Sequence, residues 1–225
     1  MNRREVQTVD RKFLHEELYR GAADLGRLAL PQLVLCGAGA LGSLLADNLV
    51  RQGFRRLRVI DRDRVEEHNI STQLYGIADV GAKKVDVLRN RLFRAVEVEI
   101  EAVAKELDER GAKSLLKGAD IVLDTFDNSA SRRLVQDACR AGNRPCLHVG
   151  LSADYCEVIW DENYRVPDDV VGDVCEYPLA RNLVLLAVAI ASESLVRYVL
   201  AGERIDRCAT LTDFTVGLLE TRRKQ

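Results

Sequence analysis

The sequence predicts an α/β protein with a Rossmann-like, doubly wound, mostly parallel sheet and helices on both faces. Short apolar segments alternate along the chain with longer segments of helical periodicity, as strands and crossover helices do in such sheets. One apolar segment runs into a glycine turn, Gly37-Ala38-Gly39-Ala40-Leu41-Gly42, and the next one ends in Asp61. We also expect a long crossover loop and a C-terminal extension.

The first elements lead into the glycine turn. Leucines at helical spacing predict an amphipathic helix over residues 11–28, which Pro31 brings to an end. The apolar run at residues 33–36 predicts a strand that is buried on both faces. A helix over residues 40–52 follows, and Gly53 is its stop signal.

The middle of the chain contains a second strand and an irregular stretch. The strand is expected over residues 57–60, and the polar residues 61–82 after it predict a loop with a helical turn. A helix is expected over residues 83–95, a strand over residues 96–103 and a short helix over residues 112–116.

A third buried strand, over residues 121–123, ends in Asp124. The helix that follows it spans residues 129–141 and has Asn128 or Ser129 as its cap. Further strands are predicted at residues 145–149, 156–160 and 208–216. A polar loop over residues 161–178 precedes a strongly apolar helix over residues 179–200, and a loop of this length is usually functional or mobile.

Size and composition limit the classes of function. The 225 residues allow an N-terminal helical segment over residues 1–32 and one nucleotide-binding domain over residues 33–225. A formal net charge of -2 argues against a general nucleic-acid or membrane-surface binder, so we expect neither partner. The first thirty residues are rich in charge, and the apolar run at residues 183–191 is too short to span a bilayer. We therefore expect a cytoplasmic protein.

The glycine turn and the acid together predict a nucleotide site. In a strand-turn-helix unit, Gly37 permits the tight turn, Gly39 lets the backbone approach phosphate, and Gly42 lets the helix pack against the strand. Free amides at the start of the helix at Ala40 suit an anion. Asp61 is placed to accept hydrogen bonds from ribose hydroxyls. This pattern does not say which nucleotide binds, and a glycine turn needed only for packing is the alternative.

More motifs follow in a fixed order. They read I-D-R-D-R-V-E-E-H-N-I-S-T-Q, then V-G-A-K-K-V, then L-D-T-F-D-N-S-A-S-R, and finally V-C-E-Y-P before the apolar helix. With the glycine turn, they make the chain resemble the ThiF/MoeB/HesA family, relatives of ubiquitin-activating enzymes, from about residue 33 to residue 200. The resemblance implies an adenylyltransferase that uses ATP to activate the C-terminal glycine carboxylate of a small ubiquitin-like or sulfur-carrier protein ending in Gly-Gly.

The resemblance gives each motif residue a role that its chemistry permits. Adenylation builds charge on phosphate oxygens, so cations and amides must be fixed around them. Lys84 would bind the triphosphate as a point charge, and Asp127 would hold Mg²⁺. The nucleotide pocket would be completed by Asp61 at the ribose and by Asp63, Asn69, Gln73 and Asn128.

Several of these residues also have a purely structural interpretation. Lys84 follows Lys83 at the start of a helix, where a surface lysine is common. Asp63 caps the following turn in this interpretation, and Asp124 closes its strand as a structural acid. For Asp127 the functional interpretation is the better one, because it lies at the carboxyl edge of the sheet, where ligands bind.

Thr72 stands where the family usually has an arginine that contacts the triphosphate. A neutral hydroxyl does not replace a bidentate cation near developing charge, and such a loss costs roughly 3 kcal/mol. Either Arg62 or Arg64 substitutes as a catalytic residue, which we favour, or the chain binds nucleotide and adenylates poorly. The family also often uses an arginine from the neighbouring subunit's N-terminal region, where this chain has Arg11 and Arg20.

Among the six cysteines, Cys175 is the one that suggests chemistry, because it lies in a polar loop. Its thiolate would attack the acyl-adenylate and displace AMP to give a thioester, or, when the cysteine already carries a persulfide sulfur, a persulfide-linked intermediate. The alternative is a loop cysteine packed under the last helix. The paired zinc cysteines of the family are missing, with Cys156 alone there, so we expect no zinc. His148 is interpreted as a core histidine and His68 as a border of the pocket.

Three further alternatives stay open from the sequence. The helix over residues 179–200 is more apolar than one sheet face needs, so it either packs a second subunit in a homodimer or is a central core helix.

A nicotinamide- or flavin-dependent oxidoreductase would share the glycine turn, but it would leave Lys84 and Asp127 without a purpose. A third hypothesis for the function is a nucleotide-binding partner subunit without catalytic activity, and Thr72 supports it.

Overall fold

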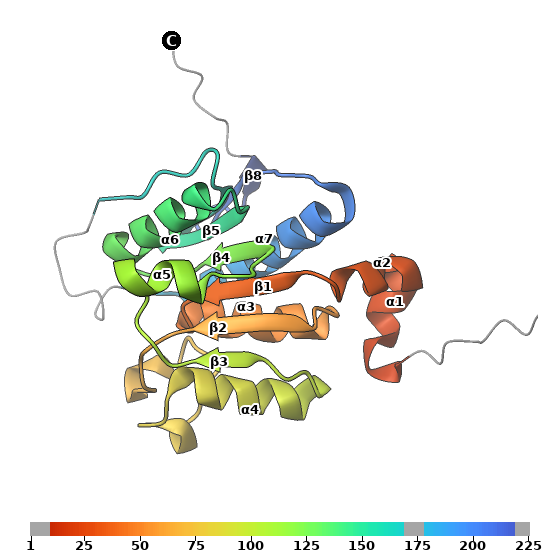
Figure 1. Ribbon diagram of the computed structural model, residues 1–225, viewed down its shortest axis with the longest axis horizontal. Coiled ribbons are helices and arrows are strands. Elements are labelled where there is room, and N and C mark those ends of the chain that lie inside the picture. Colours follow the sequence, from red (N-terminus) through yellow and green to blue (C-terminus); the bar gives the residue numbers. More distant parts are fainter. Residues whose placement is uncertain (1–9, 169–177, 219–225) are drawn as a thin grey trace, which may run out of the picture.

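One eight-stranded sheet separates two layers of helices in the computed structural model of the protein, which describes residues 10–168 and 178–218 (Figure 1). The strand order is β3-β2-β1-β4-β5-β6-β7-β8. Pairs from β3 to β5 are parallel, and pairs from β5 to β8 are antiparallel. The predicted α/β class with a doubly wound sheet is confirmed, and an antiparallel half extends its parallel half.

The parallel half contains the strands that the apolar runs predict. They are β1 (Gln32–Cys36), β2 (Arg56–Ile60), β3 (Glu101–Val103), β4 (Ile121–Asp124) and β5 (Cys146–Ser152). The last residue of β1, Cys36, is in register with both Ile60 and Asp124. The carboxyl ends of these three strands therefore meet at one edge of the sheet, at the left in Figure 1.

The antiparallel half differs from the prediction at its end. β6 (Tyr155–Trp160) forms a hairpin with β5, and it also pairs with β7 (Arg207–Thr210), which pairs with β8 (Val216–Leu218). The single final strand expected over residues 208–216 is wrong because the chain reverses within it. Phe214 takes a left-handed φ of 56° in that turn.

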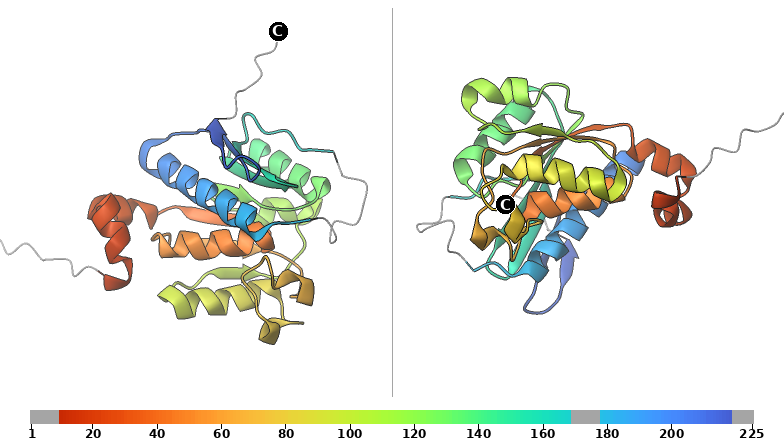
Figure 2. Two further views of the ribbon diagram at one scale, coloured as in Figure 1. Left: turned by 180° about the vertical axis from the view of Figure 1, so that it is seen from behind. Right: turned by 90° about the horizontal axis from the view of Figure 1, so that it is seen from below.

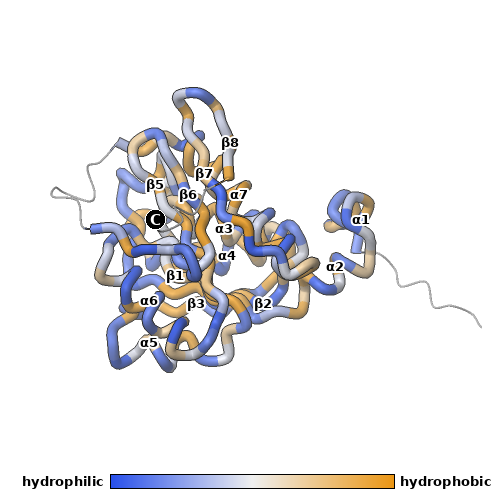
Figure 3. Tube along the Cα trace, turned by 90° about the horizontal axis from the view of Figure 1, so that it is seen from above, coloured by the Kyte–Doolittle hydropathy of each residue, from blue (hydrophilic) through white to orange (hydrophobic). Residues whose placement is uncertain are grey.

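Alternate residues of the buried strands face two separate cores, as the two-residue period of a strand requires. One core lies under α3 (Ala40–Arg51), α4 (Lys84–Val96) and α7 (Arg181–Ala201). The other lies under α5 (Glu109–Leu115) and α6 (Ser129–Ala141). The view from behind shows α3 and α7 side by side over their face (Figure 2), and hydrophobic residues follow the strands and these helices (Figure 3).

The N-terminal segment is broken where one helix was expected. It forms η1 (Arg11–Phe13), α1 (Leu14–Arg20) and α2 (Ala22–Leu28), because Gly21 takes a φ of 90° that ends α1. Arg20 connects this segment to α7 through a contact of 2.9 Å with Glu193, and it also pairs with Glu16 of its own helix at 2.7 Å. These helices lie beyond the amino ends of the parallel strands, away from the glycine turn (Figure 1).

The connection from α4 to β3 also differs from the prediction. α4 runs to Val96, and Glu97 then takes a left-handed φ of 56° as its C-cap. The strand predicted over residues 96–103 is consequently reduced to the three residues of β3. The irregular stretch between β2 and α4 is confirmed, with the short helical turns η2 (Glu67–Asn69) and η3 (Ile77–Asp79).

α7 is a core helix in its contacts. The whole helix, unlike the run at residues 183–191, is long and apolar enough to cross a membrane, and an 18-residue window of it has a mean hydropathy of 1.9. Length and composition alone give that result, and 50% of the apolar window is buried inside the protein. It packs on α3 and on strands β5 and β6. One part of α7 stays apolar and open, because Leu185 is 43% exposed.

Candidate active site

The glycine turn joins β1 to α3, and the structure shows a different physical reason for glycine at each of its three positions. Gly37 has a φ of 99°, and a Cβ there would lie 3.0 Å from Thr125 Oγ1. A Cβ on Gly42 would lie 2.0 Å from the Gly37 carbonyl oxygen, so only glycine lets α3 start so close to β1. A Cβ on Gly39 would meet nothing within 4 Å, which leaves open space beside the first turn of α3.

Asp61, at the end of β2, holds the glycine turn in place. Its Oδ2 accepts a hydrogen bond of 2.6 Å from the Ala38 N–H, and its Oδ1 accepts one of 2.7 Å from the Asp63 N–H. Burial raises the pKa of the Asp61 carboxyl, and the charge of Lys84 with the two N–H groups works against that rise. Each carboxylate oxygen keeps a second lone pair for a ribose hydroxyl. On the other side of the turn, the Tyr75 hydroxyl donates to the Ala38 carbonyl at 2.7 Å.

Lys84 is a buried cation at the start of α4. Its side chain is 8% exposed and its Nζ lies 3.3 Å from Asp63 Oδ2, while the neighbouring Lys83 is exposed. The interpretation of Lys84 as an ordinary surface lysine is therefore wrong. The ammonium is connected to the glycine turn through two aspartates. Asp63 contacts Lys84, and the Asp63 N–H donates to Asp61, which accepts from the Ala38 N–H of the turn.

The loop between β2 and α4 supplies Asn69 and Gln73. Asn69 is 4% exposed, and its Oδ1 accepts a hydrogen bond of 2.9 Å from the Glu66 N–H, so it stabilises the η2 turn. The Oε1 of Gln73 is buried and has no hydrogen-bond partner among the residues that the structure describes. A buried acceptor of this kind is normally satisfied, so Gln73 fits a position beside a bound ligand.

Asp127 and Asn128 lie between β4 and α6. Asn128 is the cap of α6, since its Oδ1 accepts from the Ser131 N–H at 2.9 Å. Asp127 is exposed, and its Oδ1 lies 3.3 Å from the Asn128 amide nitrogen. Within the described ranges it takes part in no ion pair, so its charge is open to a cation. An exposed carboxylate without an ion-pair partner among the described residues suits Mg²⁺, which takes one or two carboxylates together with phosphates and waters.

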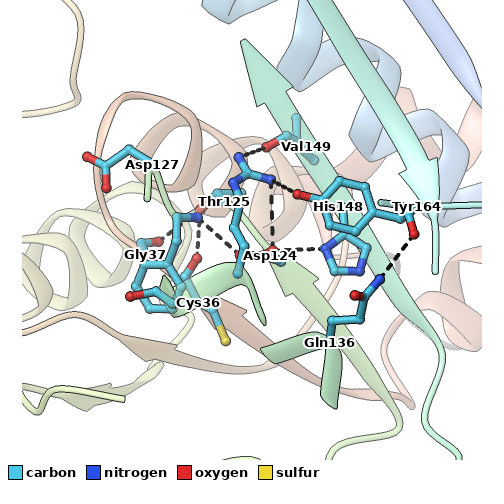
Figure 4. A network of polar contacts seen from close by, with 12 residues as sticks. Cys36, Gly37, Asp124, Thr125, Asp127, Gln136, His148, Val149 and Tyr164 are labelled. Carbon is cyan, nitrogen blue, oxygen red and sulfur yellow. Dashed lines mark hydrogen bonds and ion pairs between the residues drawn. The ribbon is translucent and has the colours of Figure 1, made fainter. Parts of the chain in front are cut away.

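Asp124 is structural, as its alternative interpretation proposed. It is fully buried and its Oδ2 lies 2.8 Å from His148 Nδ1 and 3.8 Å from Arg132 (Figure 4). Complete burial acts to raise the pKa of Asp124, but the Arg132 charge and the His148 hydrogen bond bring it below its usual value. Arg132 also donates to the Val149 carbonyl at 2.8 Å and to the Tyr164 hydroxyl at 2.9 Å.

His148 is a satisfied core histidine, as predicted, but it also connects two strand ends. Its Nδ1 faces Asp124, and its Nε2 lies 3.3 Å from Asp161 after β6. Its ring stacks on Tyr164 with 3.7 Å between centroids. Burial acts to lower the pKa of His148, and the two carboxylates raise it above its usual value. The network fixes the edge of the sheet next to Asp127.

Three site residues were missed from the sequence, and each is a partner of the glycine turn or its loop. Thr125 donates to the Cys36 carbonyl at 2.9 Å and so ties β4 to the turn, as Tyr75 does from the loop. Arg181, the first residue of α7, places its Nη1 3.2 Å from the Ser71 carbonyl oxygen and 3.5 Å from that of Gln73. Backbone contacts of this kind leave no mark in a sequence motif.

The two arginines proposed to replace the one missing at Thr72 lie elsewhere in the loop. Arg62 places its Nη1 2.5 Å from Glu106, and Arg64 donates to the Gly81 carbonyl at 2.6 Å. Their catalytic role stays a prediction. Cys175 lies outside the described residues, so its role stays a prediction too. Burial raises the pKa of the thiol of Cys156 to about 11, consistent with a small core residue.

The ThiF family model matches residues 12–163, which is more than half of the chain. The chain belongs to the ThiF family. Among its relatives, it is 37% identical over 149 residues to the adenylyltransferase and sulfurtransferase MOCS3 of Mus musculus, covering 65% of this chain and 32% of that protein. It is 38% identical over 124 residues to the sulfur carrier protein adenylyltransferase of Thermus thermophilus, covering 54% of this chain and 45% of that protein.

Solved structures share the ThiF fold with this chain. The complex of E. coli MccB with AMPCPP and MccA has a TM-score of 0.79 and 17% identity, covering 98% of this chain and 73% of that one. PaaA has a TM-score of 0.75 and 20% identity, covering 98% and 75%. The chain spans about a third to a half of the length of the curated relatives it matches.

Proposed function

We propose that this chain is an adenylyltransferase that uses ATP and Mg²⁺ to activate the C-terminal glycine carboxylate of a small ubiquitin-like or sulfur-carrier protein. Membership of the ThiF family supports this proposal, as do relatives named adenylyltransferases. The relevant partner ends in Gly-Gly, and the natural form is a cytoplasmic homodimer in which the exposed apolar part of α7 contributes to the interface.

The observation that carries the proposal is the buried lysine beside the glycine turn. Lys84 is 7% exposed, and Asp63 and Asp61 connect its ammonium to the Ala38 N–H. Removing a lysine from water is costly, and one carboxylate at 3.3 Å offsets only part of that cost. A polyanion at the adjacent helix N-terminus would supply the remaining charge, and a triphosphate is such a polyanion.

The chemistry divides between the two sides of the site. A carboxylate oxygen of the carrier attacks the α-phosphorus, a new P–O bond forms, and the bond to the bridging oxygen of the β-phosphate breaks. Pyrophosphate leaves with the electron pair, and the carrier becomes an acyl-adenylate. Lys84 and the N–H groups at the start of α3 would stabilise the charge on the phosphate oxygens, while Asp127 would hold the Mg²⁺ that neutralises them.

A second candidate function is a nucleotide-binding partner subunit without adenylation activity. Thr72 favours it, since that position offers a hydroxyl and no positive charge to the triphosphate. This candidate shares the binding half of the site with the first one, so ATP binding alone does not separate the two.

The test is ATP–pyrophosphate exchange with a panel of carrier proteins that end in Gly-Gly. We expect exchange with a member of the panel and a loss of about 100-fold or more in Asp127→Ala. Asp137→Ala is the matched control, because Asp137 is an exposed acid on α6, the helix that follows Asp127. ATP binding without exchange for any carrier would favour the partner subunit. Calorimetric binding of NAD in preference to ATP would overturn both candidates.

A further inference from the structure

Arg181 reaches the active-site loop from a distant part of the chain. It is the first residue of α7, and it lies 110 positions from Ser71 in sequence. Its Nη1 is 3.2 Å from the Ser71 carbonyl oxygen and 3.5 Å from the Gln73 carbonyl oxygen. These two carbonyls flank Thr72, so the guanidinium lies beside the residue that stands where the family usually has an arginine.

The loop that Arg181 contacts is fixed against the start of α3. The Leu74 N–H donates to Ser43 Oγ at 3.1 Å, and Ser43 belongs to the first turn of that helix. Ser43 itself is bonded through its N–H to the Gly39 carbonyl at 3.0 Å. Arg181 is thus connected by consecutive contacts to the glycine turn whose open side faces the expected phosphates.

Among the residues that the structure describes, no other side chain pairs with the charge of Arg181. Within residues 10–168 and 178–218, no carboxylate lies within ion-pair distance of it, whereas Arg62 in the same region pairs with Glu106. A guanidinium has five N–H donors. The backbone contacts engage Nη1 alone, so Nε and Nη2 keep the parallel donors that match a phosphate.

We propose that Arg181 binds the triphosphate of ATP and supplies the positive charge that Thr72 does not. The inference rests on the proposed function, because it assumes that the glycine turn binds ATP. It replaces Arg62 and Arg64 as the source of the missing cation. The buried Oε1 of Gln73, next to the carbonyl that Arg181 holds, marks the same wall of the site.

Calorimetry with MgATP and with AMP tests the proposal without needing the carrier. In Arg181→Ala we expect ATP affinity to fall about tenfold or more and AMP affinity to stay within about twofold. Arg181→Gln keeps an amide donor for the two carbonyls but lacks the charge, so it should also lose ATP affinity. Thr72→Arg in the Arg181→Ala background should restore ATP affinity to within about threefold of the wild type.

A matched control is Arg197→Ala, which removes the same charge from the same helix. Arg197 lies about 24 Å further along α7 and pairs with Glu193 and Glu203. The inference is overturned if Arg181→Ala binds ATP like the wild type, if ATP and AMP affinities fall together, or if Arg181→Gln is normal. Wild-type protein that binds neither nucleotide would instead overturn the proposed function, and this inference with it.

Discussion

Gly42 and Gly37 are in direct contact across the turn between β1 and α3. A Cβ on Gly42 would lie 2.0 Å from the Gly37 carbonyl oxygen, closer than any real contact of such atoms. The first turn of α3 can therefore stand against the end of β1 only when residue 42 has no side chain. Gly39 has no such neighbour, although it belongs to the same motif. Substitutions at Gly42 and at Gly39 should consequently have different effects.

The first prediction separates these glycines. Gly42→Ala should lower the free energy of unfolding by about 1–3 kcal/mol, because the methyl group forces α3 away from β1. Gly39→Ala should leave stability within about 0.5 kcal/mol and lower ATP affinity about tenfold, because its methyl group projects into the space for phosphate. Urea unfolding and calorimetry measure the two effects. Equal stability losses in both variants would contradict the assignment.

The second prediction concerns the lysine pair at the start of α4. Lys84→Ala should reduce ATP–pyrophosphate exchange about 100-fold, because it removes the buried cation that Asp63 and Asp61 connect to the glycine turn. Lys83→Ala should keep exchange within about twofold, since Lys83 is exposed and one residue away. Both variants should melt close to the wild-type temperature. Similar exchange rates in the two variants would show that Lys84 does not act on the phosphates.

The third prediction is for Cys175. If its thiolate accepts the activated carboxylate, Cys175→Ser should still form the acyl-adenylate and show exchange, but it should form no thiol-sensitive adduct with the carrier. Intact-mass spectrometry before and after addition of an excess of a small thiol, which cleaves a thioester by exchange, measures that adduct. Cys36→Ser is the control, because burial raises the pKa of the Cys36 thiol far above its usual value. Carrier transfer that continues unchanged in Cys175→Ser would exclude the role.

Local pattern was enough to predict the glycine turn and the strands of the parallel half, apart from the extent of β3. The strand at Leu33 and the acid at Asp61 follow from apolar runs and from spacing, which are properties of neighbouring residues. The break at Gly21 and the reversal at Phe214 were missed, because each depends on one residue with a positive φ inside an otherwise regular pattern. The spacing of apolar residues carries no information about the dihedral angle of one residue.

The sequence motifs were enough to predict which residues line the candidate site, but not which residues contact them. Arg181 meets Ser71 only because α7 packs beside α3, and His148 meets Asp124 only because β4 and β5 pair in one register. Such contacts depend on tertiary packing and not on spacing along the chain. Thr125 belongs to the L-D-T-F-D-N motif, yet its bond to the Cys36 carbonyl depends on the register between β1 and β4.

The last prediction follows from the position of His148 between two acids. A charged imidazole ring has two N–H donors, and here they face Asp124 at 2.8 Å and Asp161 at 3.3 Å. Burial opposes the charge, but the carboxylates raise the pKa of His148 above its usual value. A histidine with a higher pKa in the folded state stabilises the protein fully below its unfolded pKa of about 6.5. That stabilisation is lost as pH rises through the folded pKa.

The free energy of unfolding should therefore decrease from about pH 6.5 upward, by at most about 1.4 kcal/mol per pH unit for this one proton. Urea denaturation at a series of pH values measures the slope. His148→Gln should be less stable near pH 6 and should flatten the slope, since a neutral amide does not titrate. His15→Gln should keep the wild-type slope, because His15 is exposed on α1. A slope that survives in His148→Gln would mean that another group carries it, and that the ring between Asp124 and Asp161 is neutral throughout this range.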